Sequence, residues 1–244
     1  MIQSGQLLTR DHVPIAYDHV REGRDEIVIV CPGFFNSKKN RWMQRARDIV
    51  GKNFDTLIFD FRGHGESGGK FTWSAREHWD LEAILDFALN RGYQKIGILA
   101  FSLGAAATIN LLPHRPEIQR AVLVSCPASF WGVEYHFWRP EMLSDLKDNI
   151  ECDWEGKGAR TGFIFLPKPK PLYNVKKIQD APLLFIHGER DWIIHDRHSR
   201  QLFAAAATQN KRLEIIPGGL HAERLIQQFP EQMEQLICHW FNPG

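Results

Sequence analysis

Several features that define special classes of protein are missing from this sequence. No apolar run approaches the ~18 residues that a membrane span needs, and the first fourteen residues, MIQSGQLLTRDHVP, lack the basic and apolar regions of a secretory signal. The four cysteines lie far apart with no Cys-x-x-Cys pair, which argues against a zinc site and a disulfide scaffold. A formal net charge of +1 gives no general electrostatic reason to bind nucleic acid or an anionic membrane. We therefore expect a reduced, cytoplasmic protein with no membrane span.

What the chain does have is a regular alternation of short apolar runs with longer helical patterns. Its 244 residues are enough to bury a core. Near-continuous apolar strands are typical of a parallel sheet covered on both faces, so we predict an α/β fold with one doubly wound, mostly parallel open sheet. An antiparallel start over residues 7–8 and 13–19 is a weaker prediction. The expected parallel strands are 26–31, 56–61, 95–101, 120–125, 182–187 and 211–216.

One helix has clear sequence signals at both ends. Ser74 begins SARE, a capping box in which Glu77 follows three residues later. Apolar residues from Leu81 to Leu89 recur at helical spacing, and Gly92 follows. The pattern predicts a helix that starts near Ser74.

Residues 126–179 break the alternation, so we divide the chain into a core (1–125 and 180–244) and an insertion (126–179). Long insertions in compact domains are usually functional, and we expect this one to form a lid. The other interpretation is an extra helical subdomain whose aromatic side chains fill its own core. Its aromatic residues are Phe130, Trp131, Tyr135, Phe137, Trp138, Trp154, Phe163, Phe165 and Tyr173.

The stretch GILAFSLGAAATI places Ser102 between a buried strand and a helix of small residues. A nucleophile elbow has this arrangement: a strained turn exposes the serine hydroxyl, and the residues two before and two after it must be small. Here those residues are Ala100 and Gly104. The usual Gly-x-Ser-x-Gly pattern lacks its first glycine, and a serine that only caps the helix is the other interpretation.

A serine hydroxyl needs a histidine base, and that histidine needs a carboxylate. In an open α/β sheet both come from loops at the carboxyl ends of other strands. Asp191 follows the strand in APLLFIHG, and His221 follows the strand in LEIIPGG. Glu189, two residues before Asp191, is the rival carboxylate, and Asp153 in the insertion is a more distant one.

The chain resembles the α/β-hydrolase superfamily over nearly its whole length. The resemblance rests on five stretches in the family's order: CPGFFNS, DFRGHGESGG, the elbow, HGERD and GGLHAE. It implies the catalytic order Ser102, Asp191, His221. It also implies an oxyanion hole made by the backbone N–H groups of Phe34 and Leu103. Pro32 stands where the family has a histidine and has no N–H to donate.

Other motifs in the sequence favour plainer interpretations. GHGESG, residues 63–68, matches the Gly-x-Gly-x-x-Gly pattern of a dinucleotide site, but the next helix starts too late to meet a pyrophosphate. The fourth residue of GGKF is Phe71, where a phosphate loop needs serine or threonine.

The remaining histidines are given no catalytic role. His64 and His187 are expected to be structural, and His239 is expected to pack within the C-terminal helix. His195 and His198 lack a third ligand and are expected on the surface. No metal site is expected.

Together these features predict a serine hydrolase that cleaves a carboxylic ester, or a related acyl bond, through an acyl-enzyme without metal or cofactor. The aromatic insertion favours a small-molecule ester or acyl substrate with an apolar or aromatic group, and Trp131 and Trp138 as contacts. The alternatives are thioester or amide hydrolysis, acyl transfer or a carbon–carbon lyase reaction on the same triad, a receptor-like binding protein, and an inactive scaffold. The oligomeric state does not follow from the sequence.

Overall fold

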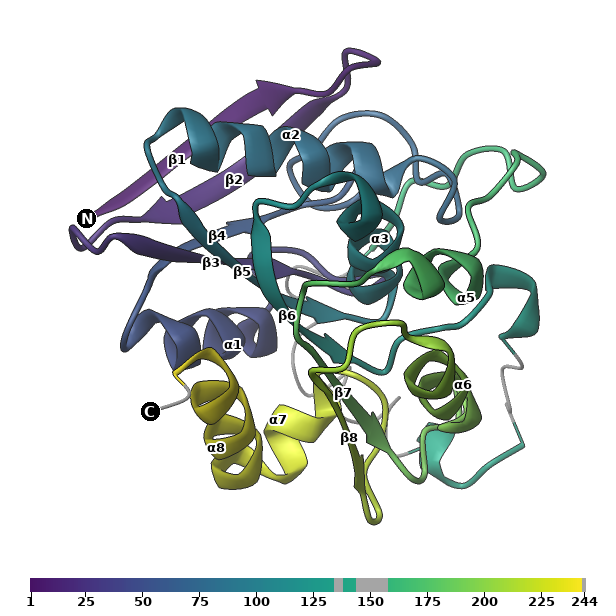
Figure 1. Cartoon of the computed structure of the whole chain (residues 1–244). Coiled ribbons are helices and arrows are strands. Elements are labelled where there is room, and N and C mark those ends of the chain that lie inside the picture. Colours follow the sequence, from purple (N-terminus) through teal and green to yellow (C-terminus); the bar gives the residue numbers. More distant parts are fainter. Residues whose placement is uncertain (134–137, 144–157, 243–244) are drawn as a thin grey trace.

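The structure is a computed structural model that describes residues 1–133, 138–143 and 158–242. The fold of these residues is built on one sheet of eight strands (Figure 1). The strands lie in the order β1-β2-β4-β3-β5-β6-β7-β8. The pairs from β4 to β8 are parallel, and β1-β2 and β2-β4 are antiparallel. The strands are β1 (Ile2–Leu8), β2 (Pro14–Val20), β3 (Glu26–Cys31), β4 (Asp55–Phe59), β5 (Lys95–Phe101), β6 (Ile118–Val124), β7 (Leu183–Gly188) and β8 (Lys211–Ile216).

The sheet confirms the predicted α/β class. Strands β3, β5 and β8 have the expected bounds, and the other parallel strands differ by one or two residues at their ends. The antiparallel start is also present, but β1 begins at Ile2 rather than near Leu7. Most of β1 is exposed or half-buried at the edge of the sheet, so its sequence has no apolar run that would reveal its length.

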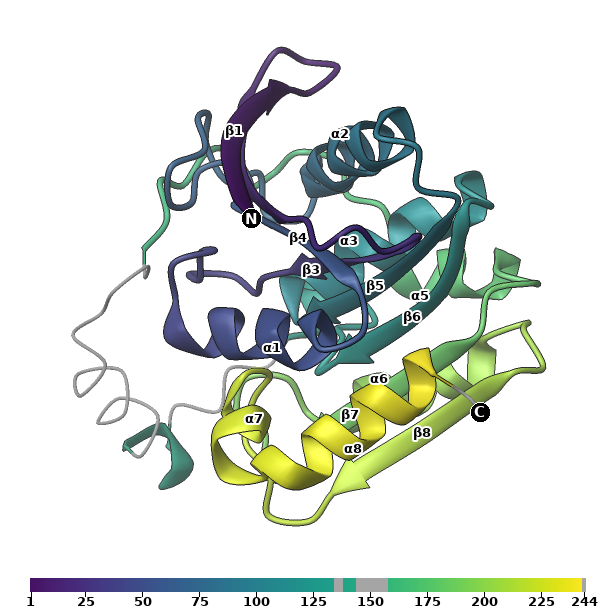
Figure 2. The ribbon, with the colours of Figure 1, turned by 90° about the vertical axis from the view of Figure 1, so that its left-hand side faces the viewer.

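Helices cover both faces of the sheet, as Figures 1 and 2 show. Successive side chains of a strand point to opposite faces: Ile27 and Ile29 of β3 pack with α2 and α3, while Val28 and Val30 pack with α1, α7 and α8. Two apolar layers therefore hold the parallel strands rigidly between them. The helices are α1 (Arg41–Gly51), α2 (Glu77–Asn90), α3 (Leu103–Leu111), α5 (Pro171–Asn174), α6 (Arg197–Ala205), α7 (Arg224–Gln228) and α8 (Pro230–Phe241).

Helix α2 starts at Glu77, so the predicted start at Ser74 is wrong. Ser74 has a φ of 69°, which takes it out of the helix. The N-cap residue is Arg76, whose N–H donates to the Thr72 hydroxyl oxygen at 2.9 Å. The Glu77 carboxylate accepts in turn from the Thr72 N–H at 2.6 Å. Glu77 thus bonds to a threonine five residues before it rather than to a serine three before it.

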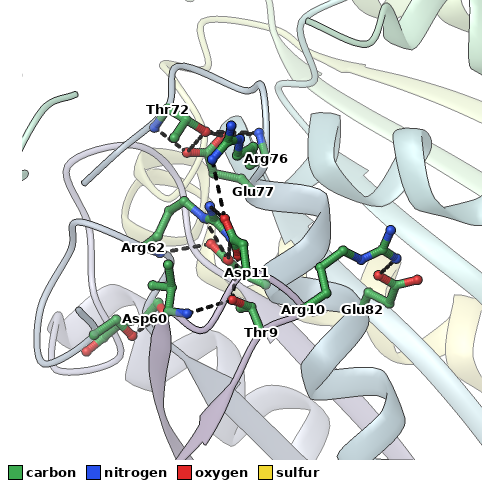
Figure 3. A network of polar contacts seen from close by, with 12 residues as sticks. Thr9, Arg10, Asp11, Asp60, Arg62, Thr72, Arg76, Glu77 and Glu82 are labelled. Atoms are coloured by element: carbon green, nitrogen blue, oxygen red, sulfur yellow. Dashed lines mark hydrogen bonds and ion pairs between the residues drawn. The ribbon is translucent and has the colours of Figure 1, made fainter. Parts of the chain in front are cut away.

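A buried ion pair anchors the turn that follows β4 (Figure 3). The Arg62 guanidinium, 2% exposed, donates to Asp80 Oδ1 from Nε at 2.8 Å and from Nη2 at 2.7 Å. It also donates to both carboxylate oxygens of Asp11. On the other side of the same turn, Asp60 accepts from the backbone N–H groups of Lys38 and Glu66. The turn from 60 to 69 is therefore fixed to α2 and to the loop after β3.

The described parts of the insertion contain the short helices η2 (Phe130–Gly132), α5 and η3 (Val175–Lys177). The segment from 158 to 162 runs back along the turn after β4: Arg160 N–H donates to the Gly63 carbonyl at 2.7 Å, and Gly162 N–H to Phe71 at 2.9 Å. Tyr135, Phe137 and Trp154 lie outside the described residues. The division into core and lid stays a prediction.

Candidate active site

The site lies where five parallel strands end. Cys31 of β3 is paired with Ala100 of β5, and Phe101 is paired with Val124 of β6. On the other side, Val124 is paired with Ile186 of β7. Gly188 of β7 is in turn paired with Ile216 of β8. The loops that leave these strand ends therefore begin side by side, and they carry the side chains that the sequence analysis singled out.

Ser102 sits on a strained turn directly after β5. Its φ of 47° and ψ of −106° lie outside the regions that non-glycine residues favour. The Ser102 N–H donates to the Val124 carbonyl at 2.8 Å, which fixes the turn to β6. The hydroxyl makes no capping hydrogen bond to α3, so this serine is not an ordinary helix cap.

The small residue two positions after Ser102 is required by close packing. A Cβ on Gly104 would lie 2.5 Å from the Cys31 carbonyl oxygen and 2.8 Å from that of Pro32. Helix α3 can approach the end of β3 this closely only because Gly104 has no side chain. Ala100, which replaces the first glycine of the usual pattern, is fully buried and is accommodated in β5.

His221 connects Ser102 to Asp191 although the three residues are far apart in sequence. His221 Nε2 lies 3.0 Å from Ser102 Oγ, and Nδ1 lies 2.6 Å from Asp191 Oδ2. The rival carboxylate has a different partner: Glu189 Oε2 accepts from the Gly218 N–H at 3.1 Å. Asp153 lies outside the described residues. The three side chains named from the sequence are therefore brought together in the order that a proton transfer needs.

Asp191 is held as an ionised carboxylate. Burial alone would raise its pKa, but the charge of His221 and hydrogen bonds from His187 and His221 outweigh burial and lower it. Its second oxygen, Oδ1, accepts from the backbone N–H groups of Ile193 at 3.0 Å and Ile194 at 2.8 Å. Both oxygens are thus satisfied, which orients the carboxylate toward His221.

His187 also contacts this carboxylate, a relationship that the sequence analysis missed. Its Nε2 lies 3.2 Å from Asp191 Oδ2 and 2.7 Å from the Ile194 carbonyl oxygen. A carbonyl only accepts, so Nε2 carries the proton, and Nδ1 accepts from the Ser199 hydroxyl at 2.7 Å. The expected structural role of His187 is therefore specific: it supports Asp191. The sequence signal was its position four residues before Asp191.

Ser125 is a second residue that the sequence analysis missed. It follows β6 with a φ of 51°, and its hydroxyl oxygen accepts from the Ala222 N–H at 3.0 Å. Ala222 is the neighbour of His221, so Ser125 fixes the loop that carries the imidazole. A lone serine before CPASF gives no sequence signal for this role.

The loop after β3 forms a tight turn beside Ser102. The Asn36 N–H donates to the Gly33 carbonyl at 3.3 Å, which places Phe34 and Phe35 at the two central positions. A Cβ on Gly33 would lie 3.5 Å from Ser102 Cβ, so the turn and the hydroxyl are neighbours. The N–H groups of Phe34 and Leu103 donate to no other described residue, which leaves both for a ligand.

The other predicted motifs have mixed outcomes. The glycines of 63–68 form a turn that ends well before α2, so the next helix does start too late for a dinucleotide site. His198 is buried rather than at the surface: its Nδ1 accepts from Ala128 N–H at 3.1 Å, and Nε2 lies 3.0 Å from the Gly132 carbonyl oxygen. His239 is exposed on α8, so its expected packing is wrong.

No helix among the described residues is both long and apolar enough to cross a bilayer. The same residues hold no group of three or more His, Cys, Asp or Glu side chains that could bind a metal ion.

A row of aromatic rings begins at the turn that contains Phe34. We call it the aromatic strip: Phe34, Trp73, Phe130, Trp131, Phe165 and Phe163, with centroids of successive rings 6.0, 6.0, 4.9, 6.4 and 5.6 Å apart. Trp131 and Phe165 are 64% and 70% exposed. Lys168 Nζ lies over the rings of Phe130 and Trp131 and donates to the Leu166 carbonyl. Trp138, the other expected contact, is 76% exposed, and its contact stays a prediction.

The sheet and the order of its loops define an α/β hydrolase. The chain belongs to the Hydrolase_4 family, described as serine aminopeptidase, S33, whose model matches residues 22–150 and 171–223. Residues 151–170, within the insertion, lie outside that match.

Among curated proteins, the chain is similar to the uncharacterized protein YfhR of Escherichia coli, with 24% identity over 201 residues. The match covers 79% of this chain and 63% of YfhR, so the chain spans less than two thirds of that relative. It is also similar to the serine hydrolase BPHL of Mus musculus, with 20% identity, 92% of this chain and 82% of that protein.

Among solved structures, the Pyrococcus furiosus esterase Pf2001 is similar with a TM-score of 0.79 and 24% identity, over 98% of this chain and 91% of that one. The carboxylesterase CesB of Bacillus subtilis has a TM-score of 0.71 and 18% identity, over 100% and 93%. At these identities the likeness establishes the fold.

Proposed function

We propose that this protein is a serine hydrolase that cleaves a carboxylic ester through an acyl-enzyme intermediate. The observation that carries the proposal is His221, which lies within hydrogen-bond distance of both Ser102 Oγ and Asp191 Oδ2. A nucleophile, a base and the group that orients the base in this arrangement serve acyl transfer on several unrelated folds. The strained backbone at Ser102 supports the same conclusion.

In the first half of the reaction, Ser102 Oγ attacks the ester carbonyl carbon while His221 Nε2 takes the hydroxyl proton. The carbonyl oxygen gains a negative charge, which the N–H groups of Phe34 and Leu103 stabilise. His221, now an imidazolium, is stabilised by Asp191, and its proton passes to the leaving alkoxide. The alcohol departs and the acyl group remains on Ser102.

In the second half, water takes the position of the alcohol. His221 removes one proton from the water, whose oxygen attacks the acyl carbon. The second tetrahedral intermediate collapses, the proton returns to Ser102 Oγ, and the carboxylic acid leaves. The same two N–H groups stabilise the charge in both halves, and no metal or organic cofactor takes part in these steps.

The substrate that we propose is an ester with an apolar or aromatic group. Phe34 supplies an N–H to the oxyanion and is also the first ring of the aromatic strip, so an apolar group of the substrate extends from the reacting carbon onto that strip. Exposed aromatic rings beside polar catalytic groups are typical of small-molecule sites. Trp131 is the proposed contact within the strip.

A fluorophosphonate probe tests the nucleophile, and multiple-turnover cleavage of p-nitrophenyl esters tests the reaction. We expect labelling and turnover in the wild type, neither in Ser102→Ala, and loss of both in His221→Ala. His239→Ala, which changes an exposed histidine on α8, is the matched control and should keep full activity. Labelling without turnover of any ester would contradict the proposal.

Two acidic residues near the imidazole provide a second test. Asp191→Asn should lower kcat by about 10⁴-fold, because the amide favours the wrong tautomer of His221. Glu189→Gln should leave kcat within about twofold of the wild type, because the Glu189 carboxylate accepts from the Gly218 N–H rather than from His221. Equal losses in the two variants would contradict the assignment of Asp191.

A further inference from the structure

The turn that carries the proposed oxyanion donor Phe34 is strained. Its third residue, Phe35, has a φ of 70°, the left-handed value that a type II turn needs at this position. Glycine or asparagine usually occupies it, because a bulky side chain there strains the backbone. Rotation of the peptide between Phe34 and Phe35 would give a type I turn and relieve that strain. Something outside the turn must therefore hold this peptide.

His64 contacts that peptide directly. Its Nε2 accepts from the Phe35 N–H at 3.1 Å, and its Nδ1 lies 3.0 Å from the Arg62 carbonyl oxygen. Because the carbonyl only accepts, the proton of the imidazole sits on Nδ1, and Nε2 is free to accept. His64 is fully buried, and burial lowers its pKa to about 4, so the ring is neutral at pH 7. The edge-on contact with the Phe34 ring at 5.7 Å adds to this support.

Two further contacts fix the same turn from other directions. The Gly158 N–H donates to the Phe35 carbonyl at 2.9 Å. The peptide after Phe35 is therefore held as well as the peptide before it. Asn36 Nδ2 donates to Glu223 Oε1 at 2.7 Å, which joins the turn to the loop of His221. His64 differs from these two contacts because it bonds to the N–H of the Phe34–Phe35 peptide, which must not rotate.

We propose that His64 is a positioning residue that keeps the Phe34 N–H aimed at the oxyanion by holding the Phe34–Phe35 peptide in its strained orientation. The inference rests on the proposed function. The Phe34–Phe35 peptide and the Gly33–Phe34 peptide, whose N–H is the donor, share the Cα atom of Phe34. Rotation of the Phe34–Phe35 peptide therefore also changes the direction of the Phe34 N–H. Displacements of about 1 Å at a catalytic group reduce rates by around 10²-fold.

The test compares His64→Ala with His64→Gln, because a glutamine places an acceptor oxygen near the position of Nε2. We expect His64→Ala to lower kcat for p-nitrophenyl butyrate by about 10- to 100-fold with little change in KM, and His64→Gln to restore most of it. His19→Ala is the matched control. His19 is 1% exposed and bonds through Nε2 to Tyr93, far from the turn, so its loss should cost stability but not kcat.

A trifluoromethyl ketone with the same acyl group separates positioning from general damage, because its adduct with Ser102 carries an oxyanion. Its Ki should rise in His64→Ala by the same factor by which kcat/KM falls, while KM for the ester stays constant. Equal kcat losses in the alanine and glutamine variants, or a kcat within twofold of wild type in His64→Ala, would overturn the proposal. An inactive wild type would overturn the proposed function instead.

A measurement on the wild type tests the proposal without any substitution, so it does not depend on whether His64→Ala folds. A long-range ¹H–¹⁵N spectrum of the imidazole nitrogens should show His64 protonated on Nδ1 and unprotonated on Nε2 at pH 7. A proton on Nε2 would remove the acceptor for the Phe35 N–H, and the proposal would fall without any substitution.

Discussion

Gly188 and Gly219 lie so close together that a Cβ on Gly188 would stand 2.3 Å from the Gly219 carbonyl oxygen. Gly188 ends β7 immediately before the loop of Asp191, and Gly219 lies two residues before His221. The two backbones therefore touch at the point where the carboxylate and the imidazole are brought within 2.6 Å. The Arg190 N–H, which donates to the Gly219 carbonyl at 2.9 Å, holds them there.

Gly188→Ala should therefore separate Asp191 from His221. The added methyl would meet backbone atoms of Gly219 and Leu220, which cannot rotate away as a side chain can. We expect kcat for a p-nitrophenyl ester to fall by about 10²-fold, and stability to fall by about 1–3 kcal/mol. Gly51→Ala is the matched control: its Cβ would lie 3.7 Å from the Thr56 methyl, an ordinary contact, and should leave kcat unchanged. Unchanged activity in Gly188→Ala would contradict this account.

The sequence predicts the sheet, and it names three side chains that the structure brings together, because both rest on strong local signals. Apolar strands repeat, and each of the side chains proposed as catalytic follows the end of one strand. The polar contacts around the triad give no such signal. His187 lies only four residues before Asp191, but that spacing alone does not show that the two side chains meet. Ser125 and His64 each bond to a residue distant in sequence, and nothing in their local sequence states that partner. The same holds for His198, which lies buried against the start of the insertion.

The start of α2 shows why a correct motif still gave a wrong boundary. SARE has the letters of a capping box, but Ser74 adopts a positive φ and Glu77 bonds to Thr72 instead. The contacts that fix this segment include the bond from the Trp73 indole N–H to the Gly162 carbonyl at 3.0 Å. That partner comes from the insertion, so no local pattern contains it.

The buried ion pair of Arg62 and Asp80 should be costly to break on one side. Arg62→Met leaves the fully buried Asp80 carboxylate without its cation, and we expect a loss of about 3–5 kcal/mol in the free energy of unfolding. The double variant Arg62→Met, Asp80→Leu removes both charges and should regain much of that loss. Urea unfolding of the wild type, both single variants and the double variant measures the coupling. Additive losses in the double variant would show that the pair does not act as a unit.

His78 provides a test of how acid acts on this fold. Burial, with help from the nearby Arg10 and Arg62, lowers its pKa to about 4. Between about pH 4 and 6.5 the unfolded chain therefore binds a proton at this site that the folded chain does not. By linkage, this histidine makes stability rise with pH across that window and fall as pH decreases.

His78→Leu should remove that contribution. Its stability relative to the wild type should improve as the pH is lowered from 6.5 to 4, as measured by urea unfolding at half-unit steps. A difference for His78→Leu that does not depend on pH would mean that this histidine titrates alike in both states.

The aromatic strip should determine preference for chain length in the proposed substrate. A methylene contributes about 0.8 kcal/mol when it is buried against apolar surface. Removing a ring that covers two or three methylenes should therefore lower kcat/KM by about 10- to 50-fold for an ester with a long acyl chain. The kcat/KM for an ester with a short acyl chain should not change. We expect this selective loss in Trp131→Ala and Phe165→Ala, measured with p-nitrophenyl decanoate against p-nitrophenyl acetate.

Tyr173→Ala is the control for these variants. Tyr173 is also an exposed ring of the insertion, at 62%, but its ring is covered by Lys177 Nζ and is not part of the strip. Its removal should change kcat/KM for neither ester by more than twofold. If Trp131→Ala lowers activity on acetate and decanoate equally, the ring supports the fold of the insertion rather than the substrate. If Tyr173→Ala reproduces the selective loss, the acyl chain of the substrate does not follow the aromatic strip, and Phe34 is not the first ring that it contacts.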